Sequence, residues 1–99
     1  MTELNNVAQL SSSGSHRECL KACQDLLQAN PEDLTALKFS GRSFIALGRF
    51  QEAQQCLKKA QDLNRDDREI LKDLGNIAVE LGDPEAAEQW YADCVGQVL

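Results

Sequence analysis

The chain has 99 residues, which suffices for one small domain with a modest core. Its 16 acidic and 10 basic residues give a net charge of −6, which repels the phosphate backbone of nucleic acids. No run approaches the roughly 18 apolar residues that a membrane span needs, so we expect neither a nucleic-acid nor a membrane partner.

Four segments have the apolar spacing of amphipathic helices, with steps of three and four residues, and in chain order they cover 33–47, 51–63, 68–81 and 85–99. Two further helices, over 2–10 and 15–31, are expected from the match of the first unit to the repeat pattern described below. Glycine and proline mark the breaks between segments, at Gly14, Pro31, Gly48, Gly82 and Pro84. No segment shows sustained alternation of period two. The sequence therefore predicts an all-α protein.

The chain repeats itself at a constant interval. "ALGRFQEA" at 46–53 returns as "ELGDPEAA" at 80–87. The same interval relates three sets of small residues: Gly14, Gly48 and Gly82; Cys19, Ala53 and Ala87; Gly41 and Gly75. Each period holds two helices and two turns, so we expect a single domain over 1–99 of three helical hairpins, in units of approximately 1–33, 34–67 and 68–99. The first unit is the most divergent.

The residues at this period resemble the tetratricopeptide repeat family, whose unit of about 34 residues places large and small residues at fixed positions of both helices. The middle unit matches it at Leu37, Ser40, Gly41, Phe44, Ala53, Leu57 and Ala60, and the third unit at Leu71, Leu74, Gly75, Ala78, Ala87 and Tyr91. The first unit departs from the pattern, with Val7 where glycine is expected. The resemblance covers residues 2–98. It implies three stacked antiparallel helical hairpins, about six helices, in a right-handed α-solenoid.

In that geometry the first helix of each hairpin lines a concave groove, which is where the family's partners bind. The residues expected to face the groove are Lys38, Phe39, Arg42, Ile45, Glu69, Lys72, Asp73, Asn76 and Val79. Those expected to bind the partner are Lys38, Phe39, Arg42, Ile45, Lys72, Asn76 and Val79. The resemblance thus implies a non-catalytic protein–protein interaction module, an adaptor or scaffold that takes a protein or peptide segment. Three cations and an amide at four-residue spacing are able to bind an acidic segment. The favoured interpretation is that these cations are solvated and pair with Asp33, Asp73 or Glu69.

Many co-chaperones of this family bind the C-terminal carboxylates of heat-shock chaperones with lysine, arginine and asparagine. The matching positions here hold Leu4, Ala8, Phe39, Glu69 and Asp73, so we expect that clamp to be absent. A less favoured alternative is a co-chaperone fragment in which Lys72 and Asn76 begin a clamp completed by later repeats.

The C-terminal segment gives a competing hypothesis from the structural class. Four apolar residues are available on it without a following polar helix to cover them: Trp90, Val95, Val98 and Leu99. Uncovered apolar surface is a typical binding site, and the partner here could be a second copy of the chain, a different protein, or the continuation of a longer polypeptide. The competing hypothesis takes the first of these, self-association as a homodimer.

Catalytic and metal sites have little support. His16, Cys19 and Cys23 can share one helical face, but both cysteines occupy packing positions of the repeat and no fourth ligand follows at a zinc-like spacing. Phosphate-binding glycine motifs are missing as well. The N-terminus has no basic start and no secretory apolar stretch, so we expect a cytoplasmic or nuclear protein with reduced thiols. We expect no enzyme activity, no cofactor and no metal.

Overall fold

The structure is a computed structural model that describes residues 14–96, which form five α-helices. In chain order these are α2 (His16–Ala29), α3 (Leu34–Ala46), α4 (Phe50–Leu63), α5 (Arg68–Glu80) and α6 (Pro84–Gly96). The helix expected over 2–10 lies outside the described residues, as do Val98 and Leu99. Residues 14–96 contain no β-strand, so the prediction of an all-α protein is confirmed.

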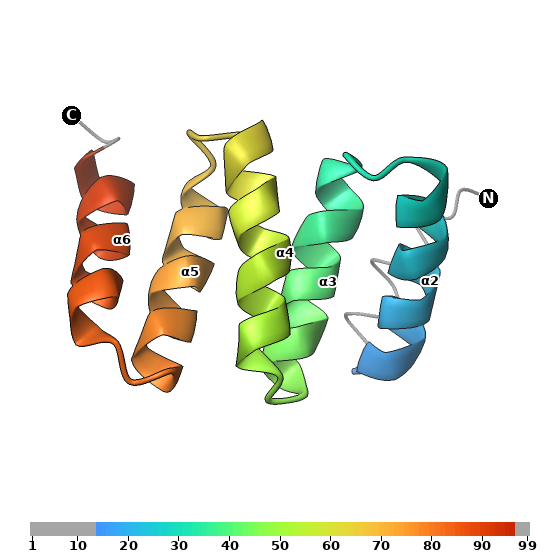
Figure 1. Cartoon of the computed structure of the whole chain (residues 1–99), viewed down its shortest axis with the longest axis horizontal. Helices are drawn as coiled ribbons and strands as arrows, with labels where there is room; N and C mark the ends of the chain where they lie inside the picture. Colours follow the sequence, from blue (N-terminus) through green and yellow to red (C-terminus); the bar gives the residue numbers. More distant parts are fainter. Residues whose placement is uncertain (1–13, 97–99) are drawn as a thin grey trace.

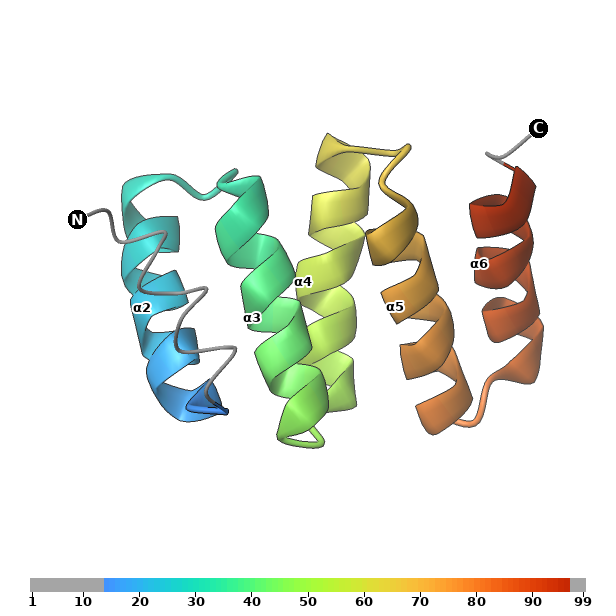
Figure 2. The ribbon, with the colours of Figure 1, turned by 180° about the vertical axis from the view of Figure 1, so that it is seen from behind.

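The helices stand side by side along the longest axis of a molecule that measures 39 × 26 × 21 Å (Figure 1). Each helix packs against the next one in the chain, and α3 also packs against α5. Figure 1 shows α4 in front of α3, whereas the view from behind shows α3 in front of α4 (Figure 2). The first and second helices of the hairpins therefore lie in two layers, as the predicted stack of hairpins requires.

The turn inside each hairpin is built on a glycine with positive φ. Gly48 has φ +77°, its N–H donates to the carbonyl of Ile45 at 3.0 Å, and the N–H of Arg49 donates to Phe44 at 2.8 Å. Gly82 begins the same pair of bonds in the last hairpin, with φ +76°. These bonds satisfy carbonyls that the helix end leaves open, in a left-handed conformation that glycine adopts without steric cost.

The turns between hairpins are closed by aspartates. Asp33 Oδ1 accepts a hydrogen bond from the N–H of Ala36 at 3.0 Å, which caps α3. Asp67, at the equivalent position of the next repeat, caps α5 by accepting from Glu69 at 3.0 Å and Ile70 at 3.3 Å. An N-cap carboxylate of this kind satisfies free backbone donors of the first helical turn.

Small residues allow the paired helices to approach closely. A Cβ on Gly41 would lie 2.5 Å from Cγ of Leu57, and one on Gly75 would lie 2.5 Å from Cε1 of Tyr91. Ala53, a small residue of α4, is fully buried. The small-residue repeat in the sequence therefore sets the spacing between helices in each hairpin.

Candidate functional site

The residues expected to line the groove lie on two helices, α3 with Lys38, Phe39, Arg42 and Ile45, and α5 with Lys72, Asn76 and Val79, and this set is called the groove below. Figure 2 is drawn from the side on which α3 lies in front of α4. The packing of α3 against α5 brings the two rows together. Their exposure is uneven: Val79 is 55% exposed, whereas Lys38, Phe39 and Ile45 are half-buried.

Two cations of the groove pair with carboxylates of the neighbouring hairpin. Lys38 Nζ lies 2.7 Å from Oδ2 of Asp67. Arg42 pairs with Glu69 and places its Nε 3.5 Å from Oδ2 of Asp73. Lys72 is exposed and has no ion pair with any described residue. The three cations of the groove thus lie among three carboxylates, and Glu80 adds a fourth carboxylate at the end of α5, so the groove has no excess of positive charge.

Burial and pairing act differently on the pKa values of the two half-buried aspartates. Burial raises the pKa of Asp67, but the hydrogen bond from Lys38 and the backbone N–H groups of Ile70 and Glu69 outweigh it, so the net pKa is lowered. For Asp73 burial is the largest effect and the nearby Arg42 offsets it only in part, so the pKa is raised. Asp67 is thus well stabilised as a carboxylate, and Asp73 is not.

Phe39 lies between the groove and the part of the core that α2 and α3 form. It packs against the buried cluster of Cys19, Cys23 and Ala36. The guanidinium carbon of Arg42 lies 5.8 Å from the centre of its ring. Phe39 therefore supports the packing of α3 on α2 as well as lining the groove.

An apolar hollow of about 360 Å³ opens at the end of the groove where α3 and α5 finish. The residues that line it are Ile45, Phe50, Asn76, Ile77, Val79, Glu80 and Tyr91. The Tyr91 hydroxyl donates to Oδ1 of Asn76 at 2.5 Å, which fixes the amide at the rim. Phe50 and Tyr91 were not among the residues expected here. The signal that could have placed Tyr91 is Gly75, which lets its ring lie close against α5.

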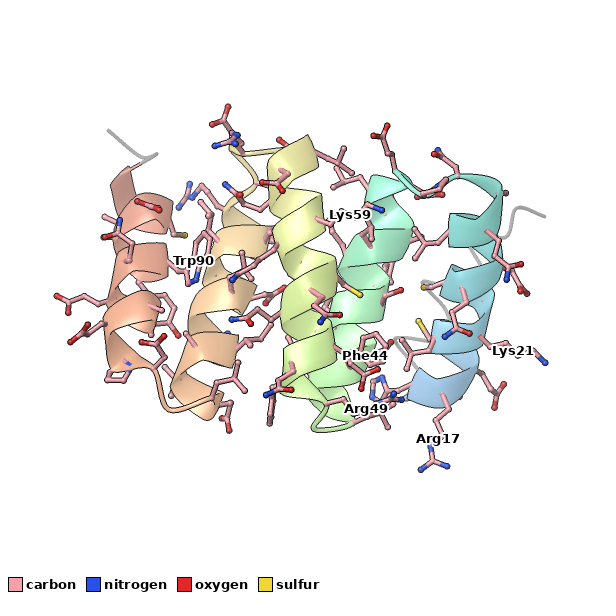
Figure 3. All side chains as sticks on the ribbon, in the orientation of Figure 1. Arg17, Lys21, Phe44, Arg49, Lys59 and Trp90 are labelled. Carbon is pink, nitrogen blue, oxygen red and sulfur yellow. The ribbon has the colours of Figure 1, made fainter. Side chains whose placement is uncertain are left out.

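The C-terminal face is a second apolar surface, adjoining the hollow through Val79 and Tyr91. Its lining residues are Val79, Pro84, Ala87, Glu88, Tyr91, Ala92 and Val95. Val95 is 65% exposed, as expected for an uncovered position. Trp90 differs from the expectation, because it packs inward against the cluster around Leu57 and Leu74 and lies between α5 and α6 (Figure 3).

The thiols of the first hairpin belong to the core. Cys19 and Cys23 are fully buried, and burial is the main cause that raises the pKa of Cys23 to about 12. Within residues 14–96, no three histidine, cysteine or acidic side chains gather in a way that would hold a metal ion. The two cysteines fill the same register positions as Ala53 and Leu57 in the middle hairpin. Their packing role accounts for their presence.

Comparison with known proteins identifies the repeat. A family model described as tetratricopeptide repeat matches residues 40–97. The probable biofilm formation methyltransferase WspC of Pseudomonas aeruginosa is 31% identical over 87 residues, which is 88% of this chain and 21% of that protein. The chain thus spans about a fifth of the length of this curated relative.

Solved structures share the fold at low sequence identity. MamA 41-end from Desulfovibrio magneticus RS-1 superposes with a TM-score of 0.91 at 18% identity, over 96% of this chain and 54% of that one. PcrH in complex with the chaperone binding region of PopB gives 0.91 at 16%, over 96% and 77%. The second repeat domain of Spaghetti (RPAP3), bound to an HSP90 peptide, gives 0.89 at 13%, over 94% and 86%. None of the described helices is long and apolar enough to cross a membrane.

Proposed function

The chain belongs to the tetratricopeptide repeat family, and on that premise we propose that it is a non-catalytic module that binds a peptide segment of another protein in the groove. The observation that carries the proposal is the apolar hollow beside a fixed amide. Contact of the exposed Val79 side chain with water is unfavourable in free energy. An apolar ligand side chain inserted into the hollow would remove Val79 from solvent, and this would contribute to the free energy of binding.

The peptide we propose is anchored by a large apolar side chain in the hollow. Its backbone would run along the groove and exchange hydrogen bonds with Asn76, whose amide nitrogen remains available as a donor. Because the cations of the groove do not outnumber its carboxylates, and Glu80 lines the hollow itself, an acidic segment gains no net attraction there. Apolar contact, and not net charge, therefore selects the ligand in this proposal.

Two structural relatives support peptide binding, since one was solved with an HSP90 peptide and another with a region of PopB. We do not extend the HSP90 peptide to this chain, because the carboxylates of Glu69 and Asp73 occupy the positions where the resemblance calls for cations. The methyltransferase activity in the name of one relative is not part of the proposal either. A fold of this kind hosts many functions, and the match covers about a fifth of that protein.

The proposal can be tested by panning a library of random peptides on the immobilised chain and measuring the affinity of the selected peptides. We expect them to share a large apolar residue and to bind Val79→Ser at least tenfold more weakly than wild type. The matched control is Leu63→Ser, which removes an apolar side chain 40% exposed at the end of α4, outside the groove. Equal binding to wild type and Val79→Ser would refute the groove as the site.

We propose self-association through the C-terminal face as a second function, with a second copy of the chain as the occupant. The repeat register favours it. Ile45, Phe50, Ala53 and Leu57 lie one repeat period before Val79, Pro84, Ala87 and Tyr91. In the middle hairpin this surface is covered by α5, and Leu57 and Ala53 are fully buried. The same surface of the last hairpin accepts an apolar helix face in the same way.

Light scattering over a range of concentrations tests this second function. We expect a dimer for wild type and a monomer for the double variant Ala92→Glu with Val95→Glu, because two charges would be desolvated at the interface. Wild type that stays monomeric at the highest concentration would rule out the homodimer.

A further inference from the structure

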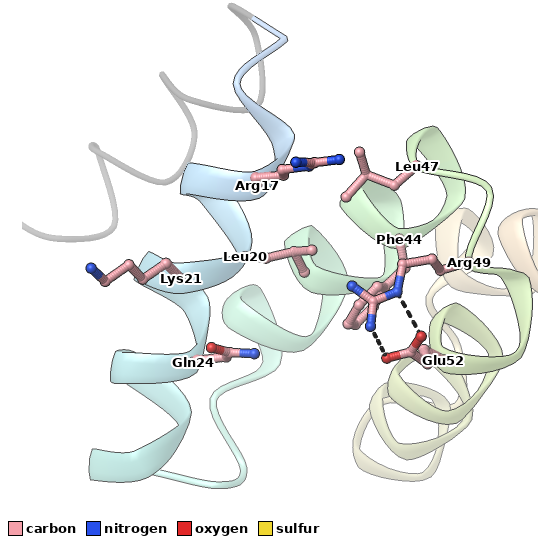
Figure 4. Close-up of a pocket in the computed structure, with 8 residues that line it drawn as sticks. All are labelled: Arg17, Leu20, Lys21, Gln24, Phe44, Leu47, Arg49 and Glu52. Atoms are coloured by element: carbon pink, nitrogen blue, oxygen red, sulfur yellow. Dashed lines mark hydrogen bonds and ion pairs between the residues drawn. The ribbon is translucent and has the colours of Figure 1, made fainter.

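A cleft of about 570 Å³ lies between α2 and α4, over the C-terminal end of α3. Its lining residues are Arg17, Leu20, Lys21, Gln24, Phe44, Leu47, Arg49 and Glu52 (Figure 4). The helices α2 and α4 do not pack against each other, and the floor between them is formed by Leu20 of α2, Phe44 of α3 and Leu47, which directly follows α3. In Figure 3, drawn from the side where α4 lies in front of α3, the labelled members of this set lie in the lower right part of the view, around the lower ends of α2, α3 and α4.

The cleft combines an apolar floor with cationic walls. Leu20 is only 6% exposed, and Phe44 and Leu47 are half-buried beside it. In Figure 4 the guanidinium groups of Arg17 and Arg49 lie on either side of this floor, whereas the ammonium group of Lys21 points away from it. A ligand in the cleft would therefore meet apolar surface below and two arginines at its edges.

Arg49 is held in a fixed position. Its Nε and Nη2 donate to the two carboxylate oxygens of Glu52, each at 2.6 Å, and its guanidinium carbon lies 5.0 Å from the centre of the Phe44 ring. These contacts use one edge of the guanidinium and leave the N–H groups of Nη1 available. Arg17 forms no ion pair with any residue in the described range.

The cleft is a positively charged region of an acidic protein. Arg17 and Arg49 stand against the single carboxylate of Glu52, which leaves one net positive charge over the floor of the cleft, and Lys21 adds a further charge at its outer edge, while the whole chain carries −6. The groove, in contrast, has no excess of cations. An acidic ligand would therefore be drawn to the cleft in preference to the groove.

The repeat itself shows that the fold does not require these residues. At the equivalent positions of the next hairpin, one repeat period later, Arg17 is replaced by Gln51, Lys21 by Gln55 and Arg49 by Asp83. Phe44 is replaced by Ala78, although Leu47 keeps its leucine as Leu81. Of the two other lining positions on α2, Leu20 is replaced by Gln54 and Gln24 by Lys58, so the equivalent set keeps one cation at another place. The repeat one period later folds in the same way without the two arginines or the aromatic ring. The packing of the repeat therefore does not explain why they are present at the cleft.

We propose that this cleft is a second docking surface, which binds a segment of a partner protein that carries a carboxylate side chain next to a large apolar one. The apolar side chain would cover Leu20 and Leu47, and the carboxylate would accept hydrogen bonds from Arg17 and from Nη1 of Arg49. The proposal does not depend on the groove, since the two surfaces share no lining residue.

Titration calorimetry with a defined peptide tests the proposal on the full chain. The probe is acetyl-Glu-Leu-Glu-Phe-amide, and the neutral comparison is acetyl-Gln-Leu-Gln-Phe-amide. We expect saturable binding of the acidic peptide that weakens as salt is raised, and at least tenfold weaker binding of the neutral one. The test variant is Arg17→Glu with Lys21→Glu. Its matched control, Lys58→Glu with Lys59→Glu, changes the net charge equally on α4 outside the cleft.

The variants and a competitor separate the outcomes. The proposal requires the Arg17/Lys21 variant to bind the acidic peptide at least tenfold more weakly, while the Lys58/Lys59 variant stays close to wild type. Equal loss in both variants would mean attraction by net charge alone and would overturn the proposal. So would full displacement of the peptide by inorganic phosphate at an equal concentration, since the cleft would then be a simple anion site. Circular dichroism confirms that both variants remain helical.

Discussion

The carboxylate of Asp67 joins two helices, because its Oδ2 lies 2.7 Å from Nζ of Lys38 on α3 while its Oδ1 accepts the backbone N–H groups of Glu69 and Ile70 at the start of α5. Only 21% of the Lys38 side chain and 12% of the Asp67 side chain are exposed. The pair therefore ties the middle hairpin to the last one at the same point where α5 begins.

Asp67→Asn isolates the ion pair, because asparagine retains an oxygen that can cap α5. We expect the variant to lose about 1 kcal/mol of unfolding free energy at pH 7, a typical value for a hydrogen bond between charged groups near the surface. The lowered pKa of Asp67 means that its stabilisation is present above the ordinary value of 3.8 and is lost as the pH falls through the folded-state pKa. Urea unfolding of wild type and the variant at neutral and strongly acidic pH measures the loss of stability and its dependence on pH. Equal unfolding free energies of the two proteins at pH 7 would contradict the prediction.

Asp73→Asn should behave in the opposite way. Burial raises the pKa of Asp73 in spite of Arg42, so its ionised form opposes folding at neutral pH. We expect the variant to be as stable as wild type at pH 7, or more stable by up to about 1 kcal/mol. The difference in unfolding free energy between the variant and wild type should become smaller as the pH falls through the raised pKa, because Asp73 of wild type then becomes protonated and neutral. A clear loss of stability at pH 7 would show that the contact with Arg42 outweighs burial.

Gly75→Ala introduces a Cβ that meets the ring of Tyr91 at 2.5 Å. Because a packed aromatic ring cannot shift without moving α6, we expect a loss of about 1–3 kcal/mol in unfolding free energy. The control is Gly96→Ala, where a Cβ meets nothing within 4 Å and the change should stay within about 0.5 kcal/mol. Chemical denaturation of both variants gives the comparison. If the two variants are equally stable, the glycine does not set the helix spacing.

Cys23 should resist alkylation in the folded protein, because it is fully buried and its pKa is raised to about 12. Burial also raises the pKa of Cys56, although part of that side chain reaches the surface. We expect iodoacetamide near pH 8 to label Cys23 only when denaturant unfolds the chain. Mass spectrometry of peptides after timed labelling measures this, and rapid native labelling of Cys23 would place it outside the core.

The repeat period was enough to predict the hairpins. Gly48 and Gly82 end the first helices, and Gly41 and Gly75 recur where helices must approach, so local sequence and packing agree at each of these positions. The inward packing of Trp90 could not be predicted in the same way. Whether Trp90 points toward the core depends on which face α6 turns toward α5. The apolar residues of α6 lie on more than one face, so the sequence pattern does not select that face.

The candidate site was only partly predictable, since it depends on contacts between hairpins. The sequence offered Glu69 and Asp73 as partners for the groove cations, and both pair with Arg42. The partner of Lys38 was not foreseen, because Asp67 lies in a turn and its cap geometry brings it to α3. The cleft was missed entirely. Arg17 and Arg49 are far apart in sequence and form no motif. They stand out only because the equivalent positions one repeat period later hold Gln51 and Asp83.

Nuclear magnetic resonance of the isotope-labelled chain, titrated with a peptide selected from the random library, tests the groove proposal most directly. We predict that the largest amide shifts map to the hollow, at Ile45, Asn76, Val79 and Tyr91. Amides around Leu20 and Arg49 on the opposite face should be unchanged. Shifts confined to that opposite face, or a spectrum that does not respond at saturating peptide, would contradict binding in the groove.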